Sequence, residues 1–314
     1  MFEKLTFRNV RRALGNPALV TGVLNEQLLR LNTLVHEYRY DGSGTAVMAE
    51  EWDTLVILDG CRYDMFARQN PLPGRLESRT SLGSQSLEFM RRNFAGGTYH
   101  DTVYVSANPY TDRLASGTFH QVVQLYEDGW DPETETVLPE TVLEAAKTAY
   151  EERPNKRFIV HFMQPHFPFI GERGRRLSHT GLAHDDIDIE GGRYPVWQNL
   201  KYGFTDISLD AVVEAYEENL DLVFPYVEEL VDALGGKTVV TSDHGNLLGE
   251  RLKPIPIRGY GHPAGIRHPK LTTVPWFVYD TDERRETVAD PPIETDDVDS
   301  DVITQRLADL GYVQ

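Results

Sequence analysis

The sequence predicts an α/β fold in which a mainly parallel central sheet is sandwiched by helices. Three observations lead to this prediction. Several apolar runs are continuous rather than alternating, as in central strands that are covered on both faces. Segments of helical periodicity lie between these runs, and strands that alternate with helices indicate a parallel sheet. With 314 residues and a single cysteine, the chain is long enough to build such a core without a disulfide framework.

The apolar runs and the periodic segments give the expected order of elements. Strands are expected at residues 54–58, 102–106, 157–162, 238–241 and 274–279. Helices are expected at residues 84–94, 137–152 and 209–234, and the last has the clearest apolar stripe. The glycine pair Gly235 and Gly236 would end that helix.

The patterning divides the chain into three parts. Residues 1–45 are expected to form an N-terminal amphipathic helical segment, and residues 46–280 the main α/β domain. Residues 281–314 are expected to form an acidic, proline-containing linker and a short C-terminal helix. Within the main domain, residues 171–205 lack periodicity, so we expect a lid or insertion at the edge of the sheet.

Charge is spread unevenly along the chain. The formal net charge is −18, and so acidic a protein argues against a nucleic-acid partner, because phosphates would be repelled. Such acidity suits a halophile-like protein in a high-salt cytosol, and an ordinary acidic protein is the alternative. Residues 1–40 are instead basic, and a helix over residues 1–14 would either contact a membrane surface peripherally or pack on its own domain. Without an apolar spanning segment or a secretory signal, we expect a cytoplasmic location, extending to the inner membrane surface.

Polar side chains gather where the predicted strands end. Asp59 follows the first strand, and His166 follows the third. Asp243 and His244 follow the fourth, and His262 lies in the loop before the last. Ligands collect at the carboxyl ends of strands in open α/β sheets, and carboxylates with imidazoles bind divalent cations. The sequence therefore predicts a divalent metal site, whose side chains admit zinc, manganese, magnesium or calcium.

A hydroxyl nucleophile is expected near the start of the 84–94 helix. A hydroxyl there lies at the positive end of the helix dipole, where free N–H groups can hold an anionic ester. Metal coordination would help to deprotonate it. Serine is also a favoured N-cap, so one of the available hydroxyls would cap the helix instead. We favour Ser84 over Ser86, with Thr80 and Ser81 behind them.

Four short motifs, taken in order, resemble the sulfatase-like branch of the alkaline phosphatase superfamily. The first is the set Asp59, Arg62 and Asp64. The others are Pro-His-Phe-Pro at 165–168, Ser-Asp-His-Gly at 242–245, and Gly-His-Pro at 261–263 ahead of a Val-Pro strand. Any one of these motifs is common, but their order and spacing match over about two-thirds of the chain. Residues 46–280 would then be a sulfatase-like catalytic domain.

The resemblance implies roles for the residues at the strand ends. It implies a metal ion bound by Asp59, Asp243 and His244 together with the nucleophile. His166 and His262 would contact the ester oxygens or protonate the leaving group, and Arg62 would be either catalytic or a structural partner of Asp64. Members that bind two metals use Asp-x-x-x-His where this chain has Phe162 and His166, so we expect a single metal ion per chain.

These observations favour a metal-dependent hydrolase or transferase that acts on a phosphate ester through an unmodified serine or threonine. The substrate would be a small-molecule, glycan or lipid-linked phosphate or sulfate ester. A sulfatase is the first alternative, although residues 84–88 and Cys61 both lack the Cys/Ser-x-Pro-x-Arg pattern that formylglycine sulfatases carry. The second alternative is a catalytically inactive metal- or anion-binding protein of the same fold.

Overall fold

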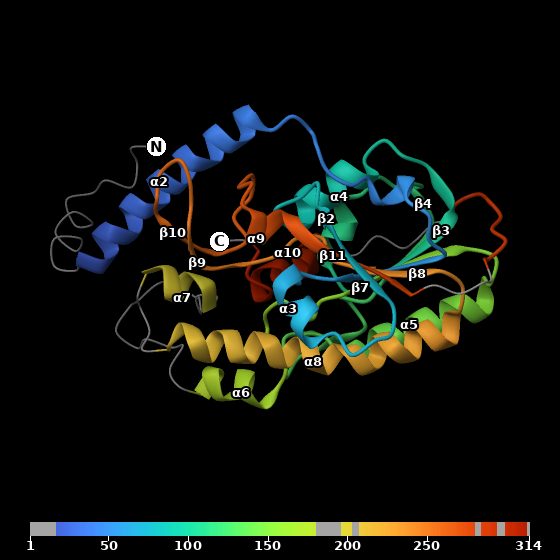
Figure 1. The fold of residues 1–314 in the computed structure, drawn as a ribbon. Helices are drawn as coiled ribbons and strands as arrows, with labels where there is room; N and C mark the ends of the chain where they lie inside the picture. The colour runs from blue at the N-terminus through green and yellow to red at the C-terminus, as the bar shows by residue number, and fades with distance from the viewer. Residues whose placement is uncertain (1–16, 180–195, 203–206, 280–283, 294–298, 313–314) are drawn as a thin grey trace.

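The computed structural model describes residues 17–179, 196–202, 207–279, 284–293 and 299–312. Its centre is a seven-stranded sheet in the order β2-β11-β8-β1-β7-β3-β4 (Figure 1). The strands are β1 (Thr54–Leu58), β2 (Arg75–Thr80), β3 (Tyr99–Ser106), β4 (Phe119–Gln124), β7 (Arg157–Phe162), β8 (Thr238–Thr241) and β11 (Thr273–Tyr279). Six of these strands run in one direction, and β11 runs in the opposite direction between β2 and β8. The predicted α/β fold with a mainly parallel sheet is confirmed.

Helices cover both faces of this sheet, and further helices pack outside it. The described helices are α2 (Pro17–Arg39), α3 (Tyr63–Gln69), α4 (Ser86–Phe94), α5 (Pro139–Glu152), α6 (Glu172–His179), α7 (Val196–Tyr202), α8 (Leu209–Leu234), α9 (Pro269–Thr272) and α10 (Ser300–Asp309). In Figure 1, α5 and α8 run side by side under the sheet, and α4 lies on the opposite side. Every residue of β1 is therefore buried, as its apolar sequence requires.

Short elements complete the chain. Two 3-10 turns, η1 (Val47–Ala49) and η2 (Pro109–Arg113), precede β1 and follow β3. Two small antiparallel pairs lie outside the main sheet, β5 (Trp130–Asp131) with β6 (Thr136–Val137) and β9 (Leu247–Arg251) with β10 (Arg258–Gly261). No helix in the described ranges is long and apolar enough to cross a membrane.

Sequence patterning missed the four short strands of the two small pairs and, in the main sheet, the strands at its two edges. β2 reads Arg-Leu-Glu-Ser-Arg-Thr and is half exposed, and β4 is buried only at its first two residues. An edge strand has a partner on one side only and borders solvent, so it does not need a continuous apolar run. The limits predicted for β1, β7, β8 and α8 agree with the structure.

Two predicted segments are described in part. The stretch 171–205 contains α6 and α7, while residues 180–195 and 203–205, like the predicted helix at 1–14, lie outside the described residues. Residues 284–293, predicted to be linker, are bound to the main domain. Arg285 donates to the carbonyl oxygens of Asp53 and Lys156 at 3.1 and 2.9 Å, and the buried Lys156 Nζ lies 2.6 Å from Asp290. The basic and acidic groups of this segment satisfy buried polar atoms at that end of the sheet.

Candidate active site

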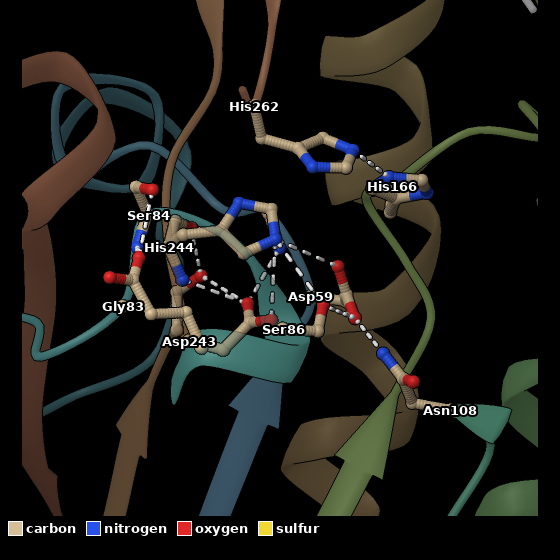
Figure 2. A network of polar contacts seen from close by, with 12 residues as sticks. Asp59, Gly83, Ser84, Ser86, Asn108, His166, Asp243, His244 and His262 are labelled. Carbon is tan, nitrogen blue, oxygen red and sulfur yellow. Dashed lines mark hydrogen bonds and ion pairs between the residues drawn. The ribbon is translucent and has the colours of Figure 1, made fainter. Parts of the chain in front are cut away.

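Charged side chains meet at the carboxyl ends of three adjacent strands (Figure 2). Asp59 follows β1, which lies between β7 and β8. His161 belongs to β7, and Asp243 and His244 follow β8. Because neighbouring parallel strands end at the same edge, residues that are far apart in the sequence come together there. All four side chains are completely buried, at 0% exposure.

Each of the two carboxylates has one oxygen that is well bonded and one that is not. Asp59 Oδ2 accepts a hydrogen bond from Asn108 Nδ2 at 2.6 Å. Asp243 Oδ1 accepts from the backbone N–H groups of Gly60 and His244 at 3.0 and 2.9 Å. Among the residues that the structure describes, no group hydrogen-bonds to the buried Asp59 Oδ1 or Asp243 Oδ2. Buried carboxylate oxygens without a partner carry a large desolvation cost, so they mark a place for a cation.

His244 completes this arrangement. Its Nδ1 lies 2.7 Å from the carbonyl oxygen of Gly245, which can only accept, so Nδ1 carries the proton. The lone pair of Nε2 then faces the two free oxygens, at 3.7 Å from Asp59 Oδ1 and 3.3 Å from Asp243 Oδ2. Two carboxylate oxygens and one imidazole nitrogen form a donor set that fits a divalent cation.

His161 is a second imidazole near the same carboxylates. One ligand atom each from Asp59, His161 and Asp243 lie within 4.8 Å of one another. His161 Nε2 lies 3.2 Å from Asp59 Oδ2, and its Nδ1 lies 2.9 Å from the Tyr104 hydroxyl. Since Asp59 Oδ2 is the oxygen that is already bonded, His161 fits the role of orienting this carboxylate better than that of a metal ligand. Burial raises the pKa of Asp59, but hydrogen bonding by His161 and the nearby imidazoles outweigh it and lower the pKa.

Ser86, rather than Ser84, lies beside these ligand candidates. Ser86 is the first residue of α4, and its Oγ lies 3.2 Å from Asp59 Oδ2 and 3.3 Å from His244 Nε2. Ser84 Oγ donates instead to Glu88 Oε2 at 2.9 Å, and the Ser84 N–H donates to the same oxygen at 2.8 Å. Ser84 thus binds a carboxylate in the first turn of α4. The N-cap of this helix is Gln85, without a side-chain cap, so the expectation that one of the four hydroxyls caps it is wrong.

The other two hydroxyl candidates are placed elsewhere. Thr80 is an exposed residue of the edge strand β2. Ser81 Oγ donates to the backbone carbonyl of Asp243 and accepts from the N–H of Gly83 at 3.1 Å. Ser81 thus positions the loop that carries Asp243, and within the described part of the chain neither hydroxyl hydrogen-bonds to Asp59 or His244.

Arg62 binds acidic side chains outside this cluster. Its Nε and Nη2 donate to the two oxygens of Asp64 at 2.9 and 2.8 Å, and its Nη1 donates to Glu250 at 2.7 Å. A further bond from Nη1 reaches the carbonyl oxygen of Asn246 at 2.8 Å. The geometry supports the structural role for Arg62 that the sequence left open, because its guanidinium fixes α3 to the segment after β8.

Replacement of Arg62 by alanine should lower the stability of the fold rather than the rate of any reaction at the site. Removal of this buried cation leaves Glu250 without its ion pair and Asp64 with Lys270 alone, so we expect the free energy of unfolding to fall by about 3 kcal/mol in urea denaturation. The matched control is Arg68→Ala, which breaks an exposed pair with Glu217 and should cost less than about 1 kcal/mol. Unchanged stability with a lost rate would instead place Arg62 on the substrate.

Asp64 should contribute a pH-dependent part of this stability. Burial raises the pKa of Asp64, but hydrogen bonds from Arg62 and Lys270 outweigh it and hold the pKa below its ordinary value. A carboxylate with a depressed pKa stabilises the fold above its unfolded pKa of about 3.9, and this contribution is lost as the pH falls through the folded pKa. Asp64→Asn should therefore flatten the loss of stability below pH 4, measured by denaturation at a series of pH values. If Asp64→Asn lost stability below pH 4 as steeply as the unchanged protein, this role of Asp64 would be contradicted.

His166 and His262 form a pair next to the metal-ligand candidates. Their Nε2 atoms lie 2.9 Å apart, and the His262 and His244 ring centroids lie 4.6 Å apart. His166 Nδ1 donates to the carbonyl oxygen of Phe167, so His166 Nε2 accepts from His262. Burial lowers the pKa of both rings, that of His262 most strongly. Phe162, at the end of β7, has no ligand atom to complete a second metal site with them.

Three residues of the site were missed in the sequence. His161 was detectable, because it is the one polar residue inside the apolar run 158–162. Asn108 was detectable too, because it follows β3 at a strand end. Tyr312 belongs to no motif, yet its hydroxyl lies 2.9 Å from Asp59 Oδ2. Its position depends on a distant segment of the chain, which no local pattern reveals.

A cavity of about 310 Å³ opens beside the cluster. His262 and Tyr312 border it on the side of the buried carboxylates, and Tyr110, Trp197 and Tyr260 supply aromatic walls. None of Asp59, Ser86, Asp243 or His244 belongs to its lining. The cavity therefore leads toward the ligand candidates but stops short of them.

Comparison with known proteins finds similarity at the level of the fold. No protein-family model and no curated protein matches the chain. Solved structures do match. The soluble domain of lipooligosaccharide phosphoethanolamine transferase A from Neisseria meningitidis is 14% identical, with 71% of this chain and 75% of that chain covered and a TM-score of 0.41.

Two further matches are similar in extent. The C-terminal periplasmic domain of EcEptC from Escherichia coli, in complex with Zn, is 13% identical, with coverages of 73% and 72% and a TM-score of 0.43. A 2-O GAG sulfatase is 12% identical, with coverages of 76% and 65% and a TM-score of 0.45. Phosphoethanolamine transferases and sulfatases belong to the sulfatase-like branch of the alkaline phosphatase superfamily, which the motifs resemble. At such low identities the similarity concerns the fold alone. The function must therefore be argued from the residues of the site.

Proposed function

We propose that this protein is a divalent-metal-dependent hydrolase or transferase that acts on phosphate esters through Ser86. One observation carries the proposal. The hydroxyl of Ser86, the free Nε2 of His244 and two carboxylates with an unbonded oxygen each converge at the N-terminus of α4. A buried hydroxyl beside an anionic donor set is the arrangement that a metal-activated nucleophile requires.

The site residues would divide the work as follows. Asp59, Asp243 and His244 would hold the cation, which when bound lowers the pKa of a neighbouring hydroxyl and stabilises negative charge on phosphate oxygens. Ser86 donates to Asp59 Oδ2, which gives its proton a route as the oxygen attacks phosphorus. The free N–H groups of the first turn of α4 would hold an oxygen of the phosphate.

The histidine pair would serve the leaving group. Formation of the bond from Ser86 Oγ to phosphorus breaks the bond to the leaving oxygen, which then needs a proton. The Nε2–H of His262, which lies 2.9 Å from His166 Nε2, would donate a hydrogen bond to this oxygen, which then takes its proton from solvent water. His262 also borders the cavity where the organic part of the ester would lie. Water, or a second hydroxyl in a transferase, would then release the phosphoryl group from Ser86. The aromatic walls of the cavity suit the ring of a sugar or an aryl group, which favours a glycan or lipid-linked ester among natural substrates.

Turnover measurements with defined metals test the proposal. The protein is stripped with a chelator, reloaded with zinc, manganese, magnesium or calcium, and assayed on aryl phosphate monoesters, phosphodiesters and sulfate esters. We expect phosphate ester turnover that disappears with the chelator and with Asp243→Ala. Turnover of the sulfate ester alone would identify a sulfatase that works without formylglycine. Metal binding without turnover of these esters, and without phosphorylation of Ser86, would favour the inactive binding protein.

A further inference from the structure

The end of α10 directs one side chain into the proposed site. Gly311 has a φ of +78° and donates its N–H to the carbonyl of Ala308 at 2.9 Å. The N–H of Tyr312 donates to the carbonyl of Leu307 at 2.8 Å. These two bonds form the glycine-based helix cap in which the chain turns sharply back. Because Leu307 and Leu310 are buried in the core, the helix and its cap hold Tyr312 in a defined place.

The ring of Tyr312 lies among the aromatic residues of the site. It stacks on His166, with centroids 4.9 Å apart and ring planes 15° from parallel. It meets Tyr110 and His262 edge-on, at 4.9 and 5.3 Å. Its hydroxyl reaches past them and lies 3.0 Å from Ser86 Oγ. A side chain that borders the cavity at one end therefore contacts the proposed nucleophile at the other.

The hydroxyl of Ser86 has no open direction in this arrangement. Besides its bond to Cβ, the oxygen has three polar neighbours, which belong to Asp59, His244 and Tyr312. Two of these neighbours form the floor of the site. Ser86 itself is completely buried. Of the three neighbours, Tyr312 is the one that borders the cavity, so the direct path from the cavity to Ser86 Oγ follows the direction that Tyr312 occupies.

We infer that Tyr312 is a gate, and that a phosphate ester reaches Ser86 only after this side chain has moved out of the site. The effect on phosphate ester binding rests on the proposed function. The closed position of Tyr312 rests only on the contacts described above. When only a fraction of molecules is open, the apparent affinity for a ligand falls in proportion to that fraction. Removal of the tyrosine ring should therefore increase both access to position 86 and affinity for phosphate.

Access to position 86 can be measured without metal or activity. The Ser86→Cys variant is treated, in chelator, with a small thiol reagent, in chains that carry tyrosine, phenylalanine or alanine at position 312. We expect Tyr312→Ala to speed modification about tenfold or more, and Tyr312→Phe, which keeps the ring, to change it much less. The native thiol of Cys61 is completely buried and reports on unfolding in the same samples. Equal rates for tyrosine and alanine, with Cys61 protected in both, would overturn the gate.

Binding of inorganic phosphate to the metal-loaded protein gives a second readout. A gate predicts that Tyr312→Ala binds phosphate about tenfold more tightly than the unchanged protein. Weaker binding would overturn the gate, because it would show that the tyrosine hydroxyl holds the phosphate. If no variant bound metal or phosphate, the proposed function would fail, and the thiol experiment would still decide whether Tyr312 controls access.

Discussion

Replacement of Ser86 by alanine should abolish phosphate ester turnover and leave metal binding in place. We expect the rate to fall by about 10³-fold or more, because the oxygen that forms the bond to phosphorus is gone. The carboxylates of Asp59 and Asp243 and the Nε2 of His244 remain, so the donor set for the cation is still present. Steady-state assays and metal titrations on the same preparation measure the two effects separately.

Ser84→Ala is the matched control for this experiment. It removes a serine hydroxyl two residues earlier in the chain. That hydroxyl donates to Glu88 and lies 3.2 Å from the carbonyl oxygen of Pro263. We expect the rate of this variant to stay close to that of the unchanged protein. The opposite pattern, with turnover lost in Ser84→Ala and kept in Ser86→Ala, would return the nucleophile to the residue that the sequence favoured.

Asp243→Asn should remove the stabilisation that a bound metal gives to the fold. A ligand at 100 times its dissociation constant stabilises the folded state by about 2.7 kcal/mol, which for a chain of this size raises the melting temperature by roughly 5 °C. The variant lacks one of the two anionic donors, so we expect its melting temperature not to respond to metal. Thermal unfolding with and without each cation measures the difference.

A half-buried carboxylate outside the cluster provides the control for the metal experiment. Asp64→Asn also removes an acidic group near the end of β1, but Asp64 is bonded to Arg62 and Lys270 and not to the cluster. This variant should keep the full metal response. A comparison of His161→Ala with His244→Ala then tests which histidine is the metal ligand. A melting temperature that no longer responds to metal in His161→Ala but still responds in His244→Ala would contradict the assignment of His244.

The site residues that could be located from the sequence each follow directly after a single predicted strand. Asp59 and Asp243 follow apolar runs whose limits agree with the structure, so the rule on strand ends was enough to bring them together. The choice between Ser84 and Ser86 needed the register of a helix start, where two residues decide which hydroxyl faces inward. The pattern of apolar residues cannot locate a helix start to within two residues, because neither serine belongs to the apolar stripe that predicts α4.

Tertiary contacts explain what the sequence could not predict. Tyr312 reaches Asp59 across 253 positions, and no spacing rule connects two residues so far apart. Edge strand β2 is recognisable only from its pairing with β11, because its own side chains read as a polar loop. In both cases the determining interaction lies in another segment of the chain.

The placement of Asp59 at the end of the central strand has a consequence for how the protein matures. The N–H of Gly60, beside Asp59, binds Asp243 across 183 positions, so the donor set exists only after β8 has joined β1. Parallel pairing of this kind closes large loops and is slow. An early folding intermediate that holds only β1, β3 and β7 would lack two of the three donors, Asp243 and His244. Metal uptake would thus be a late event, and its kinetics would report the docking of β8 during refolding.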